Sequence, residues 1–182
     1  YTQSKLVRCV KGAVLDVVVD IRKGQAGYPG ELKGSFDLSR DRGELHSNTE
    51  CGLFGVMDGD CAPVGEALPV AAACDIKPGP AAIRSNVSGS SVEEYAVEIL
   101  RGMEDSPVQN LLLRVTDERL IEKTGGIVQG MSGSPLIQNG KLIGAVTHVL
   151  VDDPTKGYAI FAENMLETAQ SVAEEQQMKD AS

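Results

Sequence analysis

The chain has 182 residues, a formal net charge of −9 and 20 glycines but no tryptophan. Its acidic balance argues against non-specific nucleic-acid binding, which needs clustered Lys and Arg. No run of about 18 apolar residues predicts a transmembrane helix, and the first ten residues lack the apolar region of a signal peptide. An apolar fraction of 42% with many Val, Ile and Gly residues predicts a globular chain rich in β-structure and turns.

The four cysteines are Cys9, Cys51, Cys61 and Cys74, and no two of them form a C-x-x-C pair. This spacing argues against a zinc site, so no metal site is predicted. Free cysteines commonly pack as small apolar side chains, and we interpret these four as buried or half-buried thiols. A disulfide between Cys51 and Cys61 is the alternative.

The first part of the chain predicts short strands separated by turns. Residues 6–22 are expected to form two strands around a turn at Lys11–Gly12, because the second run is Val-rich and alternates. A turn-rich link follows over residues 24–34, and a short strand is expected over 51–57. Residues 67–87 predict two further strands that are interrupted by the Lys-Pro-Gly-Pro sequence.

The middle of the chain alternates strands with one short helix. Residues 93–102 are expected to form a strand rather than a helix, because their apolar side chains alternate with polar or small ones. Another strand is predicted over 110–117. A helical turn should follow, with Asp117 as its cap, Lys123 in its last turn and Gly125 at its end.

The last part of the chain predicts a hairpin, a strand and a helix. An Asn-Gly pair joins two apolar runs within residues 125–149, which is a strong hairpin signal. A strand is expected over 157–163 and an amphipathic helix from about 163 to 178, with a polar tail from 174 that frays. Many short strands with turn signals indicate a mainly β fold, a barrel or a sandwich.

The sequence Gly-Met-Ser-Gly-Ser-Pro at residues 130–135 could carry chemistry. A serine hydroxyl is a poor nucleophile without a base and without donors for the oxyanion, and flanking glycines permit a tight backbone that brings N–H groups together. The pattern is similar to Gly-Asp-Ser-Gly-Gly-Pro of chymotrypsin-like proteases. On that alignment Ser132 is the nucleophile, and the N–H groups of Gly130 and Ser132 form the oxyanion hole. Most turns of this kind are structural, so the turn alone is weak evidence for a nucleophile.

The resemblance extends well beyond this turn. Residues 116–166, with the core "TGGIVQGMSGSPLIQNGKLIGAVTHV", resemble the stage IV sporulation protein B family of endospore-forming bacteria, as do shorter segments at 27–36, 48–57 and 67–71. The resemblance covers about residues 23–170. It implies a chymotrypsin-like fold, here with a C-terminal barrel, an incomplete N-terminal barrel and a short C-terminal helix.

The family resemblance also implies an activity. Its members are serine endopeptidases that need no cofactor and are secreted into the space between the two membranes of the forespore. There they cleave a membrane-associated regulatory protein that controls an intramembrane protease, which releases a late sigma factor. The implied partner is therefore a protein substrate.

Two catalytic residues follow from the resemblance. The family's nucleophile falls on Ser132 and its aspartate on Asp117. The residues themselves leave a second interpretation of Asp117 open, because an aspartate before a short helix is a good N-cap.

The base is not evident. The family's histidine lies in an Ala-Leu-Gly-His segment upstream of Gly-Tyr-Pro-Gly, and this chain has no such segment. His148 follows the nucleophile within "AVTHV" and is interpreted as a residue that lines the cleft or packs beside it. His46 fits the order His–Asp–Ser but lies where the family does not place its base. The chain alone is therefore expected to be weak or inactive.

Residues 1–24 resemble a strand pair of dTDP-4-dehydrorhamnose 3,5-epimerases, without counterparts of that family's catalytic His and Tyr. The expected divisions are this hairpin, a peptidase domain over 25–170 that lacks the histidine segment, and a polar tail over 171–182. Three functions follow: a serine endopeptidase, a non-catalytic peptide-binding remnant of the same fold, and a fragment of a cupin-type epimerase.

Overall fold

The computed structural model describes residues 43–57, 67–88, 91–103 and 106–180. The strands expected within 6–22 and the link at 24–34 lie outside these residues. The elements are, in chain order, β1 (Gly43–Thr49), β2 (Gly52–Met57), the 3-10 helix η1 (Ala73–Asp75), β3 (Gly79–Ser88), β4 (Ser91–Gly102), β5 (Leu111–Val115), α1 (Glu118–Thr124), β6 (Pro135–Gln138), β7 (Lys141–Leu150), β8 (Asp153–Phe161) and α2 (Ala162–Asp180).

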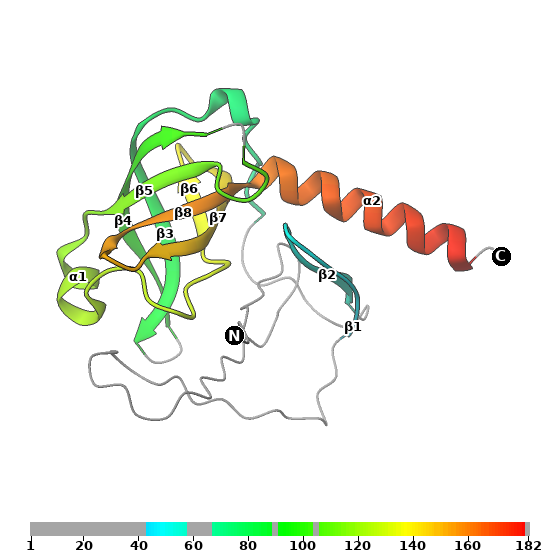
Figure 1. The fold of residues 1–182 in the computed structure, drawn as a ribbon, viewed down its shortest axis with the longest axis horizontal. Coiled ribbons are helices and arrows are strands. Elements are labelled where there is room, and N and C mark those ends of the chain that lie inside the picture. The colour runs from blue at the N-terminus through cyan, green and yellow to red at the C-terminus, as the bar shows by residue number, and fades with distance from the viewer. Residues whose placement is uncertain (1–42, 58–66, 89–90, 104–105, 181–182) are drawn as a thin grey trace.

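Six of the strands close into a barrel in the order β3-β4-β5-β8-β7-β6, while β1 and β2 form a separate two-stranded sheet. All pairs of neighbouring strands are antiparallel, including β3 with β6, which closes the barrel. Figure 1 shows the barrel on one side of the molecule and the β1–β2 hairpin on the other. The prediction of a mainly β fold built on a barrel is confirmed.

Alternating side chains of β4 and β5 fill the barrel. In β4 the buried residues are Tyr95, Val97 and Ile99, which are the positions expected from the alternation. In β5 Leu111 and Leu113 are fully buried. Successive strand residues point to opposite faces, so the period of two in the sequence predicted which residues enter the core.

The predicted hairpin is formed by β6 and β7. Asn139 and Gly140 connect the two strands with φ values of 51° and 75°. Positive φ at both central residues matches a two-residue turn whose twist suits antiparallel strands. The hairpin predicted from the Asn-Gly pair is therefore confirmed.

The structure differs from the expectations over residues 67–76. Instead of a strand, these residues form an isolated bridge between Val70 and Leu142 and the single turn of η1. The N–H of Ala73 donates to a carboxylate oxygen of Glu163 at 2.9 Å. The backbone of this segment is thus hydrogen-bonded in part to a side chain of α2, and it does not form a continuous strand ladder.

Two further elements differ in extent. The polar sequence of β1 predicted no strand, yet it pairs with β2 from Gly43 to Thr49, with a register shift between Leu45 and Ser47. Helix α2 continues to Asp180, so the tail from 174 is mostly helical and does not fray where expected. Its Glu, Gln, Met and Lys residues are good helix formers, which accounts for the extension.

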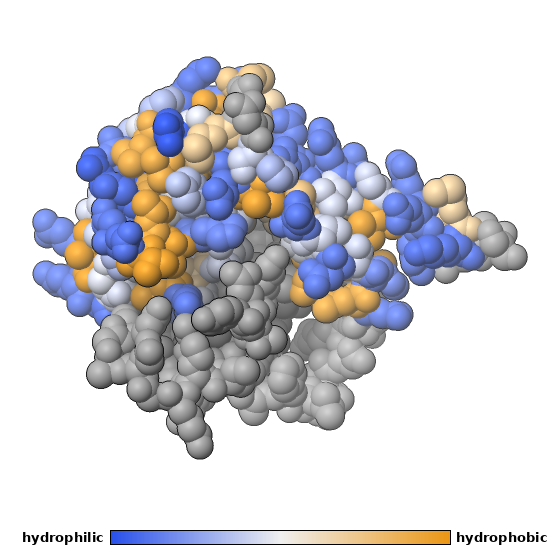
Figure 2. All heavy atoms as spheres, viewed as in Figure 1, coloured by the Kyte–Doolittle hydropathy of each residue, from blue (hydrophilic) through white to orange (hydrophobic). Residues whose placement is uncertain are grey.

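Helix α2 leaves the barrel and runs past the β1–β2 hairpin (Figure 1). Figure 2 shows that hydrophilic residues cover most of its surface in this view. Among the helices that the structure describes, none combines the length and the apolar character needed to cross a membrane.

Candidate active site

Ser132 lies in a tight turn between α1 and β6. The N–H of Met131 donates to the carbonyl of Val128 at 3.1 Å, and the N–H of Ser134 donates to the carbonyl of Met131 at 3.0 Å. Gly130 and Gly133 have φ values of 106° and 86°, a region in which side chains are strained and glycine is not. The two glycines that flank this segment thus permit the backbone path that the turn takes.

The hydroxyl of Ser132 is half-buried and points at strand β7. Its Oγ donates to the carbonyl of Thr147 at 3.0 Å. The neighbouring N–H of Gly133 donates to the carbonyl of Val146 at 2.6 Å, and the N–H of Val146 donates to the carbonyl of Ser134. Ser132 is therefore held against β7, and its proton is directed at a backbone carbonyl.

The N–H groups of Gly130 and Ser132 are the donors expected for an oxyanion. Among the residues that the structure describes, neither N–H donates to a backbone carbonyl, whereas the N–H groups of Met131, Gly133 and Ser134 all do. Within the described residues, these two N–H groups thus differ from the other three N–H groups of the turn.

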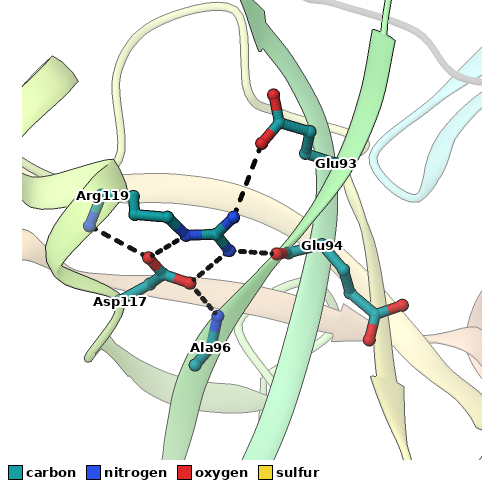
Figure 3. A network of polar contacts seen from close by, with 5 residues as sticks. All are labelled: Glu93, Glu94, Ala96, Asp117 and Arg119. Carbon is teal, nitrogen blue, oxygen red and sulfur yellow. Dashed lines mark hydrogen bonds and ion pairs between the residues drawn. The ribbon is translucent and has the colours of Figure 1, made fainter.

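Asp117 is the N-cap of α1, as its position in the sequence predicted, and Gly125 ends this helix in the left-handed conformation. One carboxylate oxygen, Oδ1, accepts from the N–H and the Nε of Arg119 at 3.0 and 3.1 Å. The other, Oδ2, accepts from the N–H of Ala96 at 3.1 Å and from Nη2 of Arg119 at 2.9 Å. Figure 3 shows this carboxylate enclosed between α1 and strand β4.

These contacts decide the charge of Asp117. The hydrogen bonds from the Arg119 side chain, aided by the N–H of Ala96, lower the pKa of the Asp117 carboxyl from 3.8 to about 2, against the opposing effect of burial. Asp117 is consequently ionised over the whole neutral range.

Among the residues that the structure describes, no shared hydrogen-bond partner joins Asp117 to Ser132. Asp117 contacts Ala96 and Arg119, whereas Ser132 contacts Thr147. Sequence reasoning missed both Arg119 and Thr147. An arginine two residues after a capping aspartate, and one threonine within an apolar strand, are the signals that could have drawn attention to them.

The two histidines lie in different sheets. His46 is half-buried on β1, in the two-stranded sheet. His148 is exposed on β7, directly after Thr147 and opposite Tyr158. Within the described residues, no hydrogen bond links either imidazole to Ser132 or Asp117.

The described cysteines, Cys51 and Cys74, carry free thiols, so the alternative of a bridge from Cys51 is wrong for this structure. Cys9 and Cys61 lie outside the described residues. In the described ranges, no group of three or more His, Cys, Asp and Glu side chains could hold a metal ion.

A pocket of about 530 Å³ opens between η1 and the ends of β4, β5 and β8. It is lined mainly by apolar side chains, among them Ile99, Met103, Leu111 and Phe161, with Lys77 beside them. None of the residues predicted for the site lines it, so this pocket and the Ser132 turn are separate features.

In a comparison with sequence families, residues 2–166 match the family described as SpoIVB peptidase S55. The match begins at residue 2 and so includes most of the segment that resembles an epimerase hairpin. Comparison with curated proteins found no match.

Solved structures similar to this chain include two of the Rv3671c protease from M. tuberculosis. The active form has a TM-score of 0.51 and 16% identity, and the alignment covers 70% of this chain and 56% of that one. The inactive form has a TM-score of 0.49, 16% identity and coverages of 71% and 66%. The chain thus spans little more than half of the active-form protease, and at this identity the likeness shows the fold alone.

Proposed function

Because this chain belongs to the SpoIVB peptidase S55 family, we propose that it is a serine endopeptidase with Ser132 as its nucleophile. The observation that carries the proposal is the turn at 130–135. It holds the Ser132 hydroxyl half-buried at the edge of β7 and leaves two neighbouring N–H groups without a backbone acceptor in the described chain.

Acyl transfer at Ser132 would proceed through a tetrahedral intermediate. The Ser132 oxygen attacks the scissile carbonyl, whose oxygen becomes negatively charged. The N–H groups of Gly130 and Ser132 would then donate to that oxygen, and such preorganised donors are worth about 3–4 kcal/mol each in related sites. For attack, the Ser132 hydroxyl must give up its hydrogen bond to the carbonyl of Thr147 and transfer its proton to a base.

Asp117 belongs to the proposal as the aspartate on which activity depends, in line with the family resemblance. His148 is proposed as a residue beside the cleft, since it follows Thr147 directly on β7. Neither His46 nor His148 is bonded to Ser132 within the described residues. We therefore expect slow hydrolysis by this chain alone, with roughly 10³–10⁴-fold acceleration over water left to binding and oxyanion contacts.

The proposed substrate is a membrane-associated regulatory protein that controls an intramembrane protease, cleaved between the two membranes of the forespore. The support for this substrate is the family resemblance. The second candidate, a peptide-binding remnant without catalysis, is favoured by the Ser132 proton being directed at a carbonyl.

A fluorophosphonate probe separates the two candidates, because it reacts with an activated serine and does not require a peptide. We expect weak labelling of the chain and slow cleavage of a peptide from such a regulator, both lost in Ser132→Ala. The matched control is Ser171→Ala, which removes an exposed serine on α2 and should change neither. Peptide binding without labelling or cleavage would establish the remnant instead.

A further inference from the structure

The carboxylate of Asp117 has no acceptor site to spare. An ionised carboxylate offers about four lone-pair sites. Four donors occupy them: the N–H, Nε and Nη2 of Arg119 and the N–H of Ala96. An aspartate that orients a catalytic imidazole must accept a hydrogen bond from it. With this arrangement no site remains for that bond.

The guanidinium that occupies Asp117 is itself held by strand β4. Nη2 of Arg119 also donates to the carbonyl of Glu94 at 2.8 Å, and Nη1 lies 3.6 Å from a carboxylate oxygen of Glu93. The guanidinium carbon lies 5.2 Å from the centre of the Tyr95 ring, within the range of a cation–π contact. Figure 3 shows the side chain reaching from α1 across to β4. Freeing Asp117 for a base would therefore break several contacts at once.

The main chain reinforces the same junction. The N–H groups of Thr116 and Asp117 both donate to the carbonyl of Ala96. The start of α1 is thus joined to β4 through the backbone and through the Asp117 and Arg119 side chains. A substitution can remove the side-chain hydrogen bonds of this junction, whereas its backbone hydrogen bonds remain.

Helix α1 leads directly into the segment that carries Ser132. After the helix ends at Gly125, the N–H of Ile127 donates to the carbonyl of Pro154 at 2.7 Å, and Met131 then bonds back to Val128. No strand separates the helix from the turn. The position of α1 on β4 therefore constrains where the segment 126–132 can lie.

We infer that Asp117 and Arg119 are positioning residues, which clamp the start of α1 to β4 and thereby fix the segment that carries Ser132. The inference rests on the proposed function of Ser132, and it gives Asp117 a task other than orienting the base. Dependence of activity on Asp117 would then come from geometry and not from the tautomer of an imidazole.

Arg119→Gln distinguishes the two roles of Asp117 by the sign of its effect on hydrolysis. If Asp117 oriented a base, removing the guanidinium would free two acceptor sites, and the rate would stay or rise. The clamp predicts instead that Arg119→Gln and Asp117→Asn slow hydrolysis to similar extents, about fivefold or more, and that the double variant is no slower than either. The inference is overturned if the rate losses of the two single variants multiply in the double variant, or if Arg119→Gln hydrolyses peptide faster than wild type.

The pH dependence of hydrolysis also distinguishes the two roles of Asp117. Displacement of the segment that carries Ser132 should not change the pKa of the base. An orienting carboxylate stabilises the charged imidazole, so its removal would lower the pKa of the base. With the clamp, Asp117→Asn lowers the rate at every pH and leaves the acid limb of the kcat profile where it was. A limb that moves to lower pH in Asp117→Asn contradicts the inference.

Hydrogen exchange tests the clamp in the whole chain even where no hydrolysis is detected. The amides of Ile127 and Met131 should exchange about fivefold faster in Asp117→Asn and in Arg119→Gln, the factor equivalent to about 1 kcal/mol. The control is Arg114→Gln, which breaks the ion pair with Glu98 between β4 and β5 but does not touch α1. Unchanged exchange in both clamp variants overturns the inference.

The proposed function fails in a different way. Ser132→Ala should abolish hydrolysis and leave the exchange of the Ile127 and Met131 amides as it was. If no variant and no wild-type chain hydrolyses peptide, the peptidase proposal is lost, and the exchange experiment still decides whether the clamp exists.

Discussion

Ser132 and Asp117 differ in how their polar groups are occupied. Within the described residues, the hydroxyl of Ser132 bonds to a single group, the carbonyl of Thr147. The carboxylate of Asp117 is bound by four donors and its side chain is only 11% exposed. Asp117 is therefore the more firmly held of the two side chains.

Because the hydrogen bonds to Asp117 lower its pKa, the stability of the folded chain should depend on pH at acidic pH. The pKa of Asp117 is lowered to about 2, first by the hydrogen bonds from Arg119, so its ionised form stabilises the folded chain above the unfolded pKa of 3.8. That contribution is lost as the pH falls from about 4 through 2. Urea unfolding should show Asp117→Asn to be less stable than wild type at pH 7, with the difference shrinking below pH 4. A difference that is the same at pH 7 and pH 2.5 would contradict this assignment.

At the scale of elements, the end of α1 and the start of β8 fit closely. A Cβ added to Gly126 would overlap the carbonyl of Pro154, and Gly126 has a φ of 129°. The preceding Gly125 also has a positive φ, 75°, but a Cβ there would meet nothing within 4 Å. Alanine at position 125 would therefore meet backbone strain alone, whereas alanine at position 126 would meet both strain and overlap.

Gly126→Ala should destabilise the chain more than Gly125→Ala. Backbone strain costs about 1 kcal/mol for alanine in the left-handed region, and overlap in a packed site adds about 1–3 kcal/mol. We expect the free energy of unfolding to fall by about 1 kcal/mol in Gly125→Ala and by about 2–4 kcal/mol in Gly126→Ala, measured by urea denaturation. Equal losses in the two variants would mean that the end of α1 and the start of β8 are not packed as the structure has them.

For the whole molecule, the barrel contains the main core and the β1–β2 hairpin stands outside it (Figure 1). Leu113 on β5 is completely buried, while Leu45 on β1 is 66% exposed. The same substitution at these two leucines therefore compares the barrel with the hairpin.

Leu113→Ala should lower the free energy of unfolding by about 2–5 kcal/mol, since it removes buried apolar volume and leaves a cavity. Leu45→Ala should change it by less than about 0.5 kcal/mol, as expected of an exposed site. Both values can be read from urea denaturation followed by circular dichroism. A large loss at Leu45 would show that the hairpin carries part of the core.

The sequence determined the local features, because each is encoded by neighbouring residues. The alternation at Tyr95, Val97 and Ile99 predicted the buried face of β4, the Asn-Gly pair predicted the β6–β7 turn, and Asp117 predicted the cap of α1. The motif around Ser132 predicted the family, which the match over residues 2–166 confirms.

Only the tertiary structure decided which distant groups meet. Strand β1 is polar and forms by pairing with β2, and the segment before β3 bonds to α2 through Glu163, so neither has a periodic signal of its own. The same holds for the site: the bond from Ser132 to Thr147 and the enclosure of Asp117 by Arg119 and β4 depend on how strands and helix pack. A sequence shows which residue types are present, but whether a carboxylate is open to a base or already occupied depends on the neighbours that folding brings to it.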